Sequence, residues 1–165
     1  MKKFIVISGV IVLLGLVAGG IYYLLNRLPE ENPSETQTPE TKTYRNEEFG
    51  FEFQYPSDWK IIENPYGSPF SKFNLIVVPA EEKYLPDPIL VNIVMPDFAY
   101  NAFSDLRGID VVVANVIGKK YEYQEEGLSE ISIILPFGEN EIILGTNKTY
   151  EDVFNRVIST FKFLK

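Results

Sequence analysis

The residues best suited to chemistry in this sequence are its carboxylates, because the 165 residues include neither cysteine nor histidine. Without those two residue types the chain alone cannot form a Ser-His-Asp or Cys-His catalytic group, a thiolate metal site or a histidine-based zinc or iron site. The carboxylates stand out as three adjacent pairs, Glu47-Glu48, Glu81-Glu82 and Glu125-Glu126. Adjacent residues point to opposite faces of a strand, and on loops they are usually solvated charge. The pairs therefore indicate surface charge more than a shared site.

Carboxylates serve two kinds of chemistry in proteins of this composition, cation binding and glycoside hydrolysis. A calcium site needs several oxygen ligands, and no EF-hand-like loop gathers them; Asp87, Asp97 and Glu81 are the candidates for a divalent cation. Glycoside hydrolysis needs two carboxylates across a cleft, one with a raised pKa, and no spacing in the chain indicates such a pair. We expect no catalytic residue, no cofactor and no metal site, and a carboxylate-based hydrolase is the third of three hypotheses.

Aromatic residues on one loop are the best candidates for contact with a partner. Residues 64–71 (NPYGSPFS) place Tyr66 and Phe70 among proline and glycine, and aromatic side chains on loops are often contact residues. The alternative is that both rings fold inward. Trp59 follows a YPSD turn, and we interpret it as a core residue that fixes this turn in preference to a carbohydrate-stacking residue.

The N-terminal segment is typical of a membrane anchor. Residues 4–25 form an apolar run that, as a helix about 33 Å long, is sufficient to cross a hydrocarbon core of about 30 Å. Lys2 and Lys3 precede the run, which favours a cytoplasmic N-terminus and a single-pass protein whose domain lies outside the cytoplasm. The alternative is a signal peptide cleaved near Ala18-Gly19-Gly20, which places the domain on the same side of the membrane.

Gly15 and Gly19 form a G-x-x-x-G pair within this run. Such a pair lets two membrane helices approach closely, so these glycines are the candidate contact of a weak homodimer. The alternative is that glycine is simply common in membrane helices.

The chain is expected to have three parts: an anchor over residues 1–28, a linker over 29–43 and a domain over 44–165. The linker is rich in Pro, Glu and Thr and has no large apolar residue, which is typical of an extended tether. After Arg27 the chain has 12 basic and 23 acidic residues, a net charge of −11. Such an excess repels phosphate, so nucleic acid is excluded as a partner.

The domain is predicted to be α+β, an antiparallel β-sheet flanked by helices. One helix is expected over residues 97–107 with Gly108 as its C′ residue, and a second begins with Thr149 as cap and Asp152 completing the capping box. Residues 161–163 either finish this helix or add a closing strand, and 119–123 extend the strand at 111–117 onto an exposed edge. A turn at 138–140 predicts a hairpin. The expected strands are 49–55, 59–62, 73–78, 89–95, 111–117, 131–135 and 141–144.

Two end motifs carry a resemblance to a known family. The run GFEFQYPSDW at 50–59 resembles the entry of PsbP-like domains, VISTFKF at 157–163 resembles the helix that closes them, and Gly118 lies where that family often has a glycine-containing strand. The resemblance implies an antiparallel sheet with helices on both sides, in exported or anchored proteins that mostly bind or assemble and are not enzymes. The photosynthetic role of some members and their metal-binding residues have no counterpart here.

These features predict a non-enzymatic, membrane-anchored extracytoplasmic module that contacts another envelope component. The first alternative is a domain that senses a small ligand or a divalent cation, with the sheet and helices forming a pocket.

Overall fold

The computed structural model describes residues 40–81 and 88–164. The predicted membrane helix, Gly15, Gly19 and Asp87 lie outside these residues. Among the residues that are described, no helix has both the length and the apolar character needed to span a membrane.

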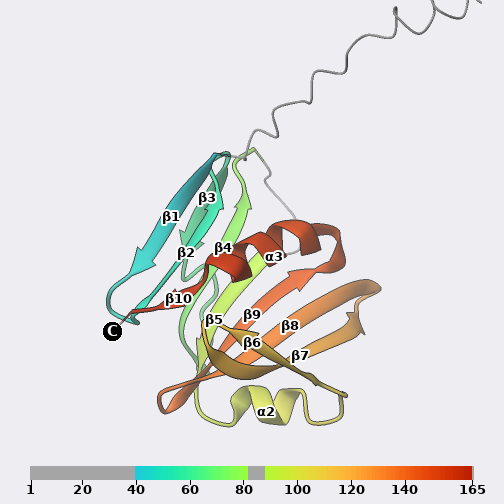
Figure 1. Ribbon diagram of the computed structural model, residues 1–165. Coiled ribbons are helices and arrows are strands. Elements are labelled where there is room, and N and C mark those ends of the chain that lie inside the picture. Colours follow the sequence, from blue (N-terminus) through green and yellow to red (C-terminus); the bar gives the residue numbers. More distant parts are fainter. Residues whose placement is uncertain (1–39, 82–87, 165) are drawn as a thin grey trace, which may run out of the picture. The chain divides into compact units, whose positions relative to one another are not determined.

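Two antiparallel sheets form the framework of the domain (Figure 1). The larger has seven strands in the order β3-β4-β5-β9-β8-β7-β6, and the smaller has three in the order β1-β2-β10. The large sheet contains β3 (Trp59–Glu63), β4 (Ser71–Pro79), β5 (Ile89–Val94), β6 (Ile109–Val113), β7 (Val116–Glu125), β8 (Leu128–Phe137) and β9 (Asn140–Asn147). The small sheet contains β1 (Thr41–Asn46), β2 (Phe51–Pro56) and β10 (Lys162–Phe163).

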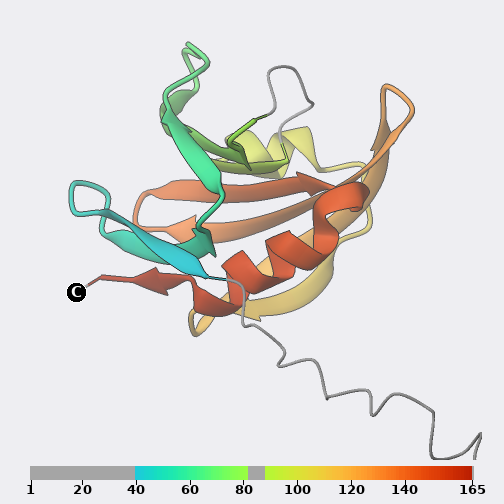
Figure 2. The same cartoon turned by 90° about the horizontal axis from the view of Figure 1, so that it is seen from above.

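Helix α3 (Glu151–Thr160) and the small sheet cover one face of the large sheet (Figures 1 and 2). The period-two pattern of β2 turns Phe51 and Phe53 inward, where both stack on Phe161 at ring-centroid distances of 5.6 and 6.0 Å. The helical stripe of α3 adds Phe154 and Val157, both 1% exposed. The predicted α+β class, with its antiparallel sheet, is confirmed.

The opposite face carries the short helix α2 (Phe98–Ala102), and we call it the α2 face. Among the residues that the structure describes, its buried apolar cluster consists of Val94, Ala99, Ile134 and Ile143. The apolar cluster on the α2 face is therefore much smaller than the one under α3.

The prediction of one strand over residues 111–117 is wrong. The chain reverses at Ala114 and Asn115, whose φ angles of 50° and 65° form the two-residue turn that suits a hairpin between β6 and β7. The run of Val and Ile on both sides hides this turn, because alanine is an unusual residue at positive φ. Residues 119–123 belong to β7: Lys119 and Lys120 pair with β6 as well as β8, whereas residues 121–123 pair with β8 alone and lie on an open edge, as predicted.

Both predicted helices have different ends in the structure. The first, α2, spans five residues instead of 97–107. Gly108 is therefore not its C′ residue. It directly precedes β6, and a Cβ there would lie 2.8 Å from the Tyr121 ring. The second, α3, begins at Glu151 after Tyr150 and has no side-chain cap; Asn147 caps the turn that precedes it, where its Oδ1 accepts a hydrogen bond from the N–H of Thr149 at 3.0 Å. Thr149 itself lies in a 3₁₀ turn, η1 (Lys148–Tyr150), so the predicted capping box does not form.

The first strand of the domain begins earlier than predicted, and the last segment adopts one of its two predicted alternatives. Strand β1 begins at Thr41, three residues before the predicted domain start at Tyr44, because it pairs along the whole of β2. At the C-terminus, Lys162 and Phe163 form the closing strand β10, the second of the two predicted alternatives.

Candidate binding surface

A loop between β3 and β4 is fixed to the α2 face by asparagines. Asn64 and Asn74 bond reciprocally, Asn64 N–H to the Asn74 carbonyl at 2.6 Å and Asn74 N–H to Asn64 Oδ1 at 3.2 Å. The Asn74 side chain, 5% exposed, donates to the carbonyl of Tyr66 at 2.9 Å. Asn64 has φ 47°, a left-handed conformation that asparagine tolerates better than most residues. The base of the loop is therefore held although its tip is exposed.

Tyr66 and Phe70 are both exposed at the end of this arrangement, by 52% and 50%. Phe70 stacks on Phe98 of α2 with 5.1 Å between ring centroids, and its carbonyl accepts a hydrogen bond from Met95 N–H at 3.0 Å. Met95 is itself 43% exposed. We call Tyr66, Phe70, Met95 and Phe98 the aromatic surface. It joins the segment before β4 to the segment after β5.

The start of helix α2 is held by a side chain of the sheet and not by a capping side chain of its own. Asp97 has φ 59° and makes no side-chain cap, so the first helical N–H groups need another acceptor. Glu141 of β9 provides one: its Oε2 accepts from Ala99 N–H at 2.8 Å. After the helix, the ring of Phe103 lies 5.1 Å from that of Tyr121. These contacts hold the aromatic surface at one end of the α2 face.

A groove of about 260 Å³ lies on the other side of α2, over β7, β8 and β9. Its volume is below the range of about 300–1,000 Å³ for small-molecule sites, so it fits one side chain of a partner better than a cofactor. At its rim Lys119 and Asp110 form an ion pair at 2.6 Å. The apolar lining comes from Tyr100, Ile117, Tyr121, Ile134 and Pro136.

A second cavity, about 220 Å³, lies farther along the α2 face. Tyr123 and Ser132 share a hydrogen bond of 3.1 Å there, and burial raises the pKa of Tyr123 despite that bond. Glu125 and Glu130 complete an acidic lining. Its volume is also below the range for small-molecule sites, so only its acidic lining supports the small-ligand alternative.

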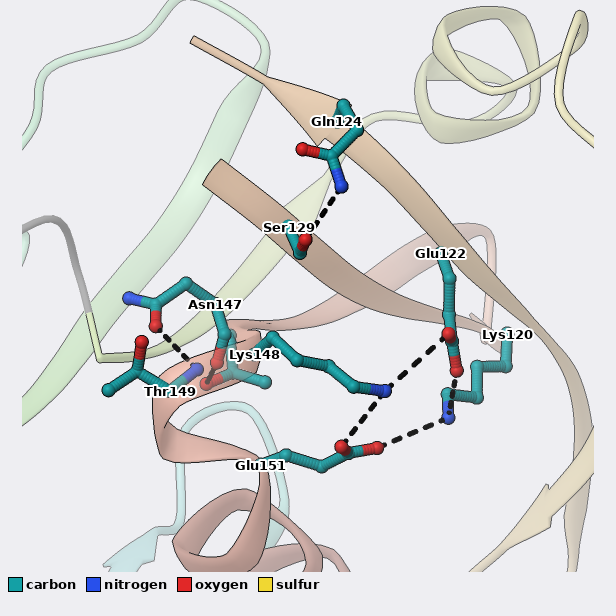
Figure 3. A network of polar contacts seen from close by, with 9 residues as sticks. Lys120, Glu122, Gln124, Ser129, Asn147, Lys148, Thr149 and Glu151 are labelled. Atoms are coloured by element: carbon teal, nitrogen blue, oxygen red, sulfur yellow. Dashed lines mark hydrogen bonds and ion pairs between the residues drawn. The ribbon is translucent and has the colours of Figure 1, made fainter. Parts of the chain in front are cut away.

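A polar network marks the opposite, α3 side of the sheet (Figure 3). Lys120 binds Glu122 at 2.7 Å, and Lys148 binds Glu151 at 2.9 Å. Hydrogen bonding from Lys120, followed by its charge and that of Lys148, lowers the pKa of Glu122. The four charges balance one another and join β7 to the start of α3, so the network is structural in character.

Neither Tyr66 nor Phe70 folds inward; their contact with a partner stays a prediction. In the described part of the chain, no three acidic side chains, Glu81 and Asp97 included, gather into a possible metal site. Met95, Phe98 and Glu141 were not expected from the sequence, because their relation to Phe70 and α2 depends on strand pairing.

The elements define an α+β domain with an antiparallel sheet covered unequally on its two faces. No family model matches the chain, and no curated protein matches it. Among solved structures, cyanobacterial PsbP from Synechocystis sp. PCC 6803 is similar with 11% identity and a TM-score of 0.47, over 78% of this chain and 95% of that one. PsbP is the family that residues 50–59 and 157–163 resemble.

Two further solved structures are similar at the same level. LpqN, described as involved in cell envelope biogenesis of Mycobacterium tuberculosis, has 14% identity and a TM-score of 0.42, over 76% of this chain and 91% of that one. A protein from Bacteroides thetaiotaomicron VPI-5482 has 15% identity and a TM-score of 0.45, over 75% of this chain and 48% of that one. At these identities the likeness concerns the fold alone.

Proposed function

We propose that this protein is a non-enzymatic, membrane-anchored module whose extracytoplasmic domain binds another component of the cell envelope through the aromatic surface. The observation that carries the proposal is the exposure of Tyr66, Phe70 and Met95 on segments that are themselves fixed by hydrogen bonds and ring stacking. The anchor and the side of the membrane come from residues 1–28 of the sequence.

The composition of the surface suits a protein partner. Aromatic residues and methionine are enriched at protein interfaces, where rigid rings supply large contact area at a low entropy cost. The stacking of Phe70 on Phe98 already restricts one ring, and the asparagine bonds restrict the loop below Tyr66. Less ordering is then needed when a partner binds, which favours affinity.

The experiment that tests this proposal is site-specific photocrosslinking of the full chain in its native membrane. A photoreactive phenylalanine analogue at position 70 is expected to trap one partner in a stoichiometric band, identified by mass spectrometry. The same analogue at Leu128, 41% exposed in the β7–β8 hairpin, is the matched control. Tyr66→Ala together with Met95→Ala should abolish the band from position 70. Equal products from both positions, or none from position 70, would overturn the proposal.

The second cavity supports a sensor of a small cationic ligand as the alternative function, since Glu125 and Glu130 line it. A thermal-shift screen of the full chain in detergent micelles, using amines and divalent cations, tests this alternative. A shift in melting temperature that Glu125→Gln removes, while the crosslink at position 70 is absent, would replace the first proposal with the second.

A further inference from the structure

Strand β6 is the last strand of the large sheet, and no hydrogen bond to its outer edge occurs within the described residues (Figure 1). Because the turn has two residues, Val113 and Val116 next to it form a hydrogen-bonded pair, and the direction of the backbone groups alternates from there. The N–H and C=O groups of Asp110 and Val112 therefore point away from β7. They present the pattern that an additional strand recognises.

The side chains along this edge are exposed and apolar. Val112 and Ile117 are cross-strand neighbours, exposed by 69% and 68%, and Ile109 is 57% exposed. Edge strands are commonly protected by lysine, proline or a bulge, because an open apolar edge is a template for pairing. Strand β6 contains no lysine or proline, and its pairing with β7 has no register shift. Its only charged residue is Asp110, whose Oδ1 pairs with Lys119 Nζ of β7 at 2.6 Å and whose side chain, still 73% exposed, can meet a second cation.

We propose that the β6 edge accepts one added strand from a partner protein. The segment that fits is extended, with an aliphatic residue opposite Val112 and a basic residue two positions away, opposite Asp110. Main-chain hydrogen bonds supply affinity in this mode, and alternate side chains supply specificity. Cross-strand pairs of aliphatic residues and of opposite charges stabilise neighbouring strands. This inference goes beyond the proposed function, because it uses another surface and a different kind of contact.

A second copy of this chain fits the same edge poorly. Only the outward-pointing residues of two edges can bond each other, so two antiparallel β6 strands must place Asp110 opposite Val112, opposite Asp110 or opposite the turn residue Ala114 of the other copy. None of these registers adds a cation from the other copy to the one that Lys119 of β7 already supplies to Asp110, and one sets two carboxylates face to face. The net charge of −11 after Arg27 adds repulsion between copies and attraction for a basic segment.

The groove beside α2 adjoins the β6 edge and offers a second contact for the added strand. Asp110, Ile117 and Lys119 line it together with Tyr100. A long apolar side chain from the added strand, on the same face as Val112, would lie next to Ile117 and reach toward this groove.

The test uses full-length protein in neutral detergent micelles and a fluorescein-labelled peptide of six alternating valines and lysines. The comparison peptide alternates valine and glutamate. Two variants change the net charge equally: Asp110→Lys at the edge, and Glu139→Lys in the exposed β8–β9 turn. Anisotropy titrations, corrected with empty micelles, measure binding, and hydrogen exchange followed by mass spectrometry or NMR measures protection of the Asp110 and Val112 amides.

We expect Asp110→Lys to weaken the lysine peptide at least tenfold and Glu139→Lys to weaken it less than twofold. Asp110→Lys should also gain binding to the glutamate peptide. The amides of Asp110 and Val112 should exchange more slowly when the lysine peptide is bound to the unmodified protein. Absence of binding, equal weakening by both variants, or unchanged exchange at these two amides would overturn the proposal. So would self-association in sedimentation velocity that Val112→Lys abolishes, because a second copy would then occupy the edge.

Discussion

The two faces of the large sheet differ in how they are closed. On the α3 face, seventeen buried residues form one cluster, and the helix and the small sheet cover it. On the α2 face, the buried cluster has four residues, and the helix above it has five. Most of the buried apolar contacts that stabilise the domain therefore lie on the α3 face, and the α2 face contributes fewer of them.

The difference also appears in the polar contacts. On the α3 side, ion pairs join the side chains of Lys120, Glu122, Lys148 and Glu151, so each of these four charges has a partner of opposite sign (Figure 3). On the α2 side, one carboxylate, that of Glu141, holds the helix through a single N–H. The same face is also held by the asparagine bonds of the loop before β4 and by the ion pair at the groove, so its polar contacts are dispersed and do not form one network.

The largest contrast should come from removing one ring on each face. Phe51 is 0% exposed and stacks on Phe161, so Phe51→Ala should lower the free energy of unfolding by about 3–5 kcal/mol. Phe70 is 50% exposed, so Phe70→Ala should cost less than about 1 kcal/mol. Urea unfolding of the full chain in micelles, followed by the fluorescence of the single tryptophan, Trp59, measures both. Equal losses would mean that the aromatic surface belongs to the core.

A second contrast comes from glycine. A Cβ at Gly118 would clash with the Ile134 carbonyl oxygen and the Leu135 side chain, whereas one at Gly67, in the loop before β4, would meet nothing within 4 Å. Gly118→Ala should therefore cost about 1–3 kcal/mol through displaced strands. Gly67→Ala should be neutral or stabilise by up to about 1 kcal/mol, because it restricts the unfolded chain. The same urea titrations compare them, and a neutral Gly118→Ala would contradict the close approach of β7 and β8.

The parts of the fold that follow from local pattern were predictable from sequence. Alternation places Phe51 and Phe53 in the core, and the helical stripe places Phe154 and Val157 there. The turn at Ala114-Asn115 was missed because no turn-forming pair interrupts the apolar run, and only the register of β6 on β7 reveals it. Propensity alone does not identify such a turn, since tertiary pairing decides it.

The candidate site was only half predictable for the same reason. Tyr66 and Phe70 are neighbours in sequence, so composition indicates their loop. Met95 and Phe98 join them because β4 and β5 pair Ser71 with Val94, a long-range register with an irregularity that the sequence does not show. Glu141 is 42 residues from Ala99, and no local signal connects a strand carboxylate with the start of a distant helix.

A local effect is expected when the support of α2 is removed. Glu141→Ala deletes the acceptor of Ala99 N–H, and a lost cap of this kind costs about 1 kcal/mol. Hydrogen exchange of the full chain should show faster exchange of the Ala99 and Phe103 amides, by about fivefold, and unchanged exchange in β2. Glu139→Ala, two residues earlier, is the control and should change neither region. Uniform acceleration across both faces would show that α2 and the core unfold as one unit.

The smallest effect should come from the network on the α3 side and should depend on pH. Because the folded-state pKa of Glu122 lies below its ordinary value of 4.5, its pairing stabilises the fold above that pH and is lost as pH falls through the lowered pKa. The hydrogen bond that Lys148 donates to Glu151 raises the pKa of Lys148, so that contact persists through neutral pH and is lost only above the ordinary value of 10.5.

Urea midpoints of the full chain should therefore change little between pH 6 and 9 and fall slightly more below pH 4.5 than those of Glu122→Gln. High salt should reduce this difference, since the charges are exposed and screened. Glu126→Gln, an exposed turn residue outside the network, controls for net charge and should follow the unmodified protein. If Glu122→Gln also follows it at every pH, the four charges are only a solvated surface, and the stability of the α3 face comes from its apolar contacts alone.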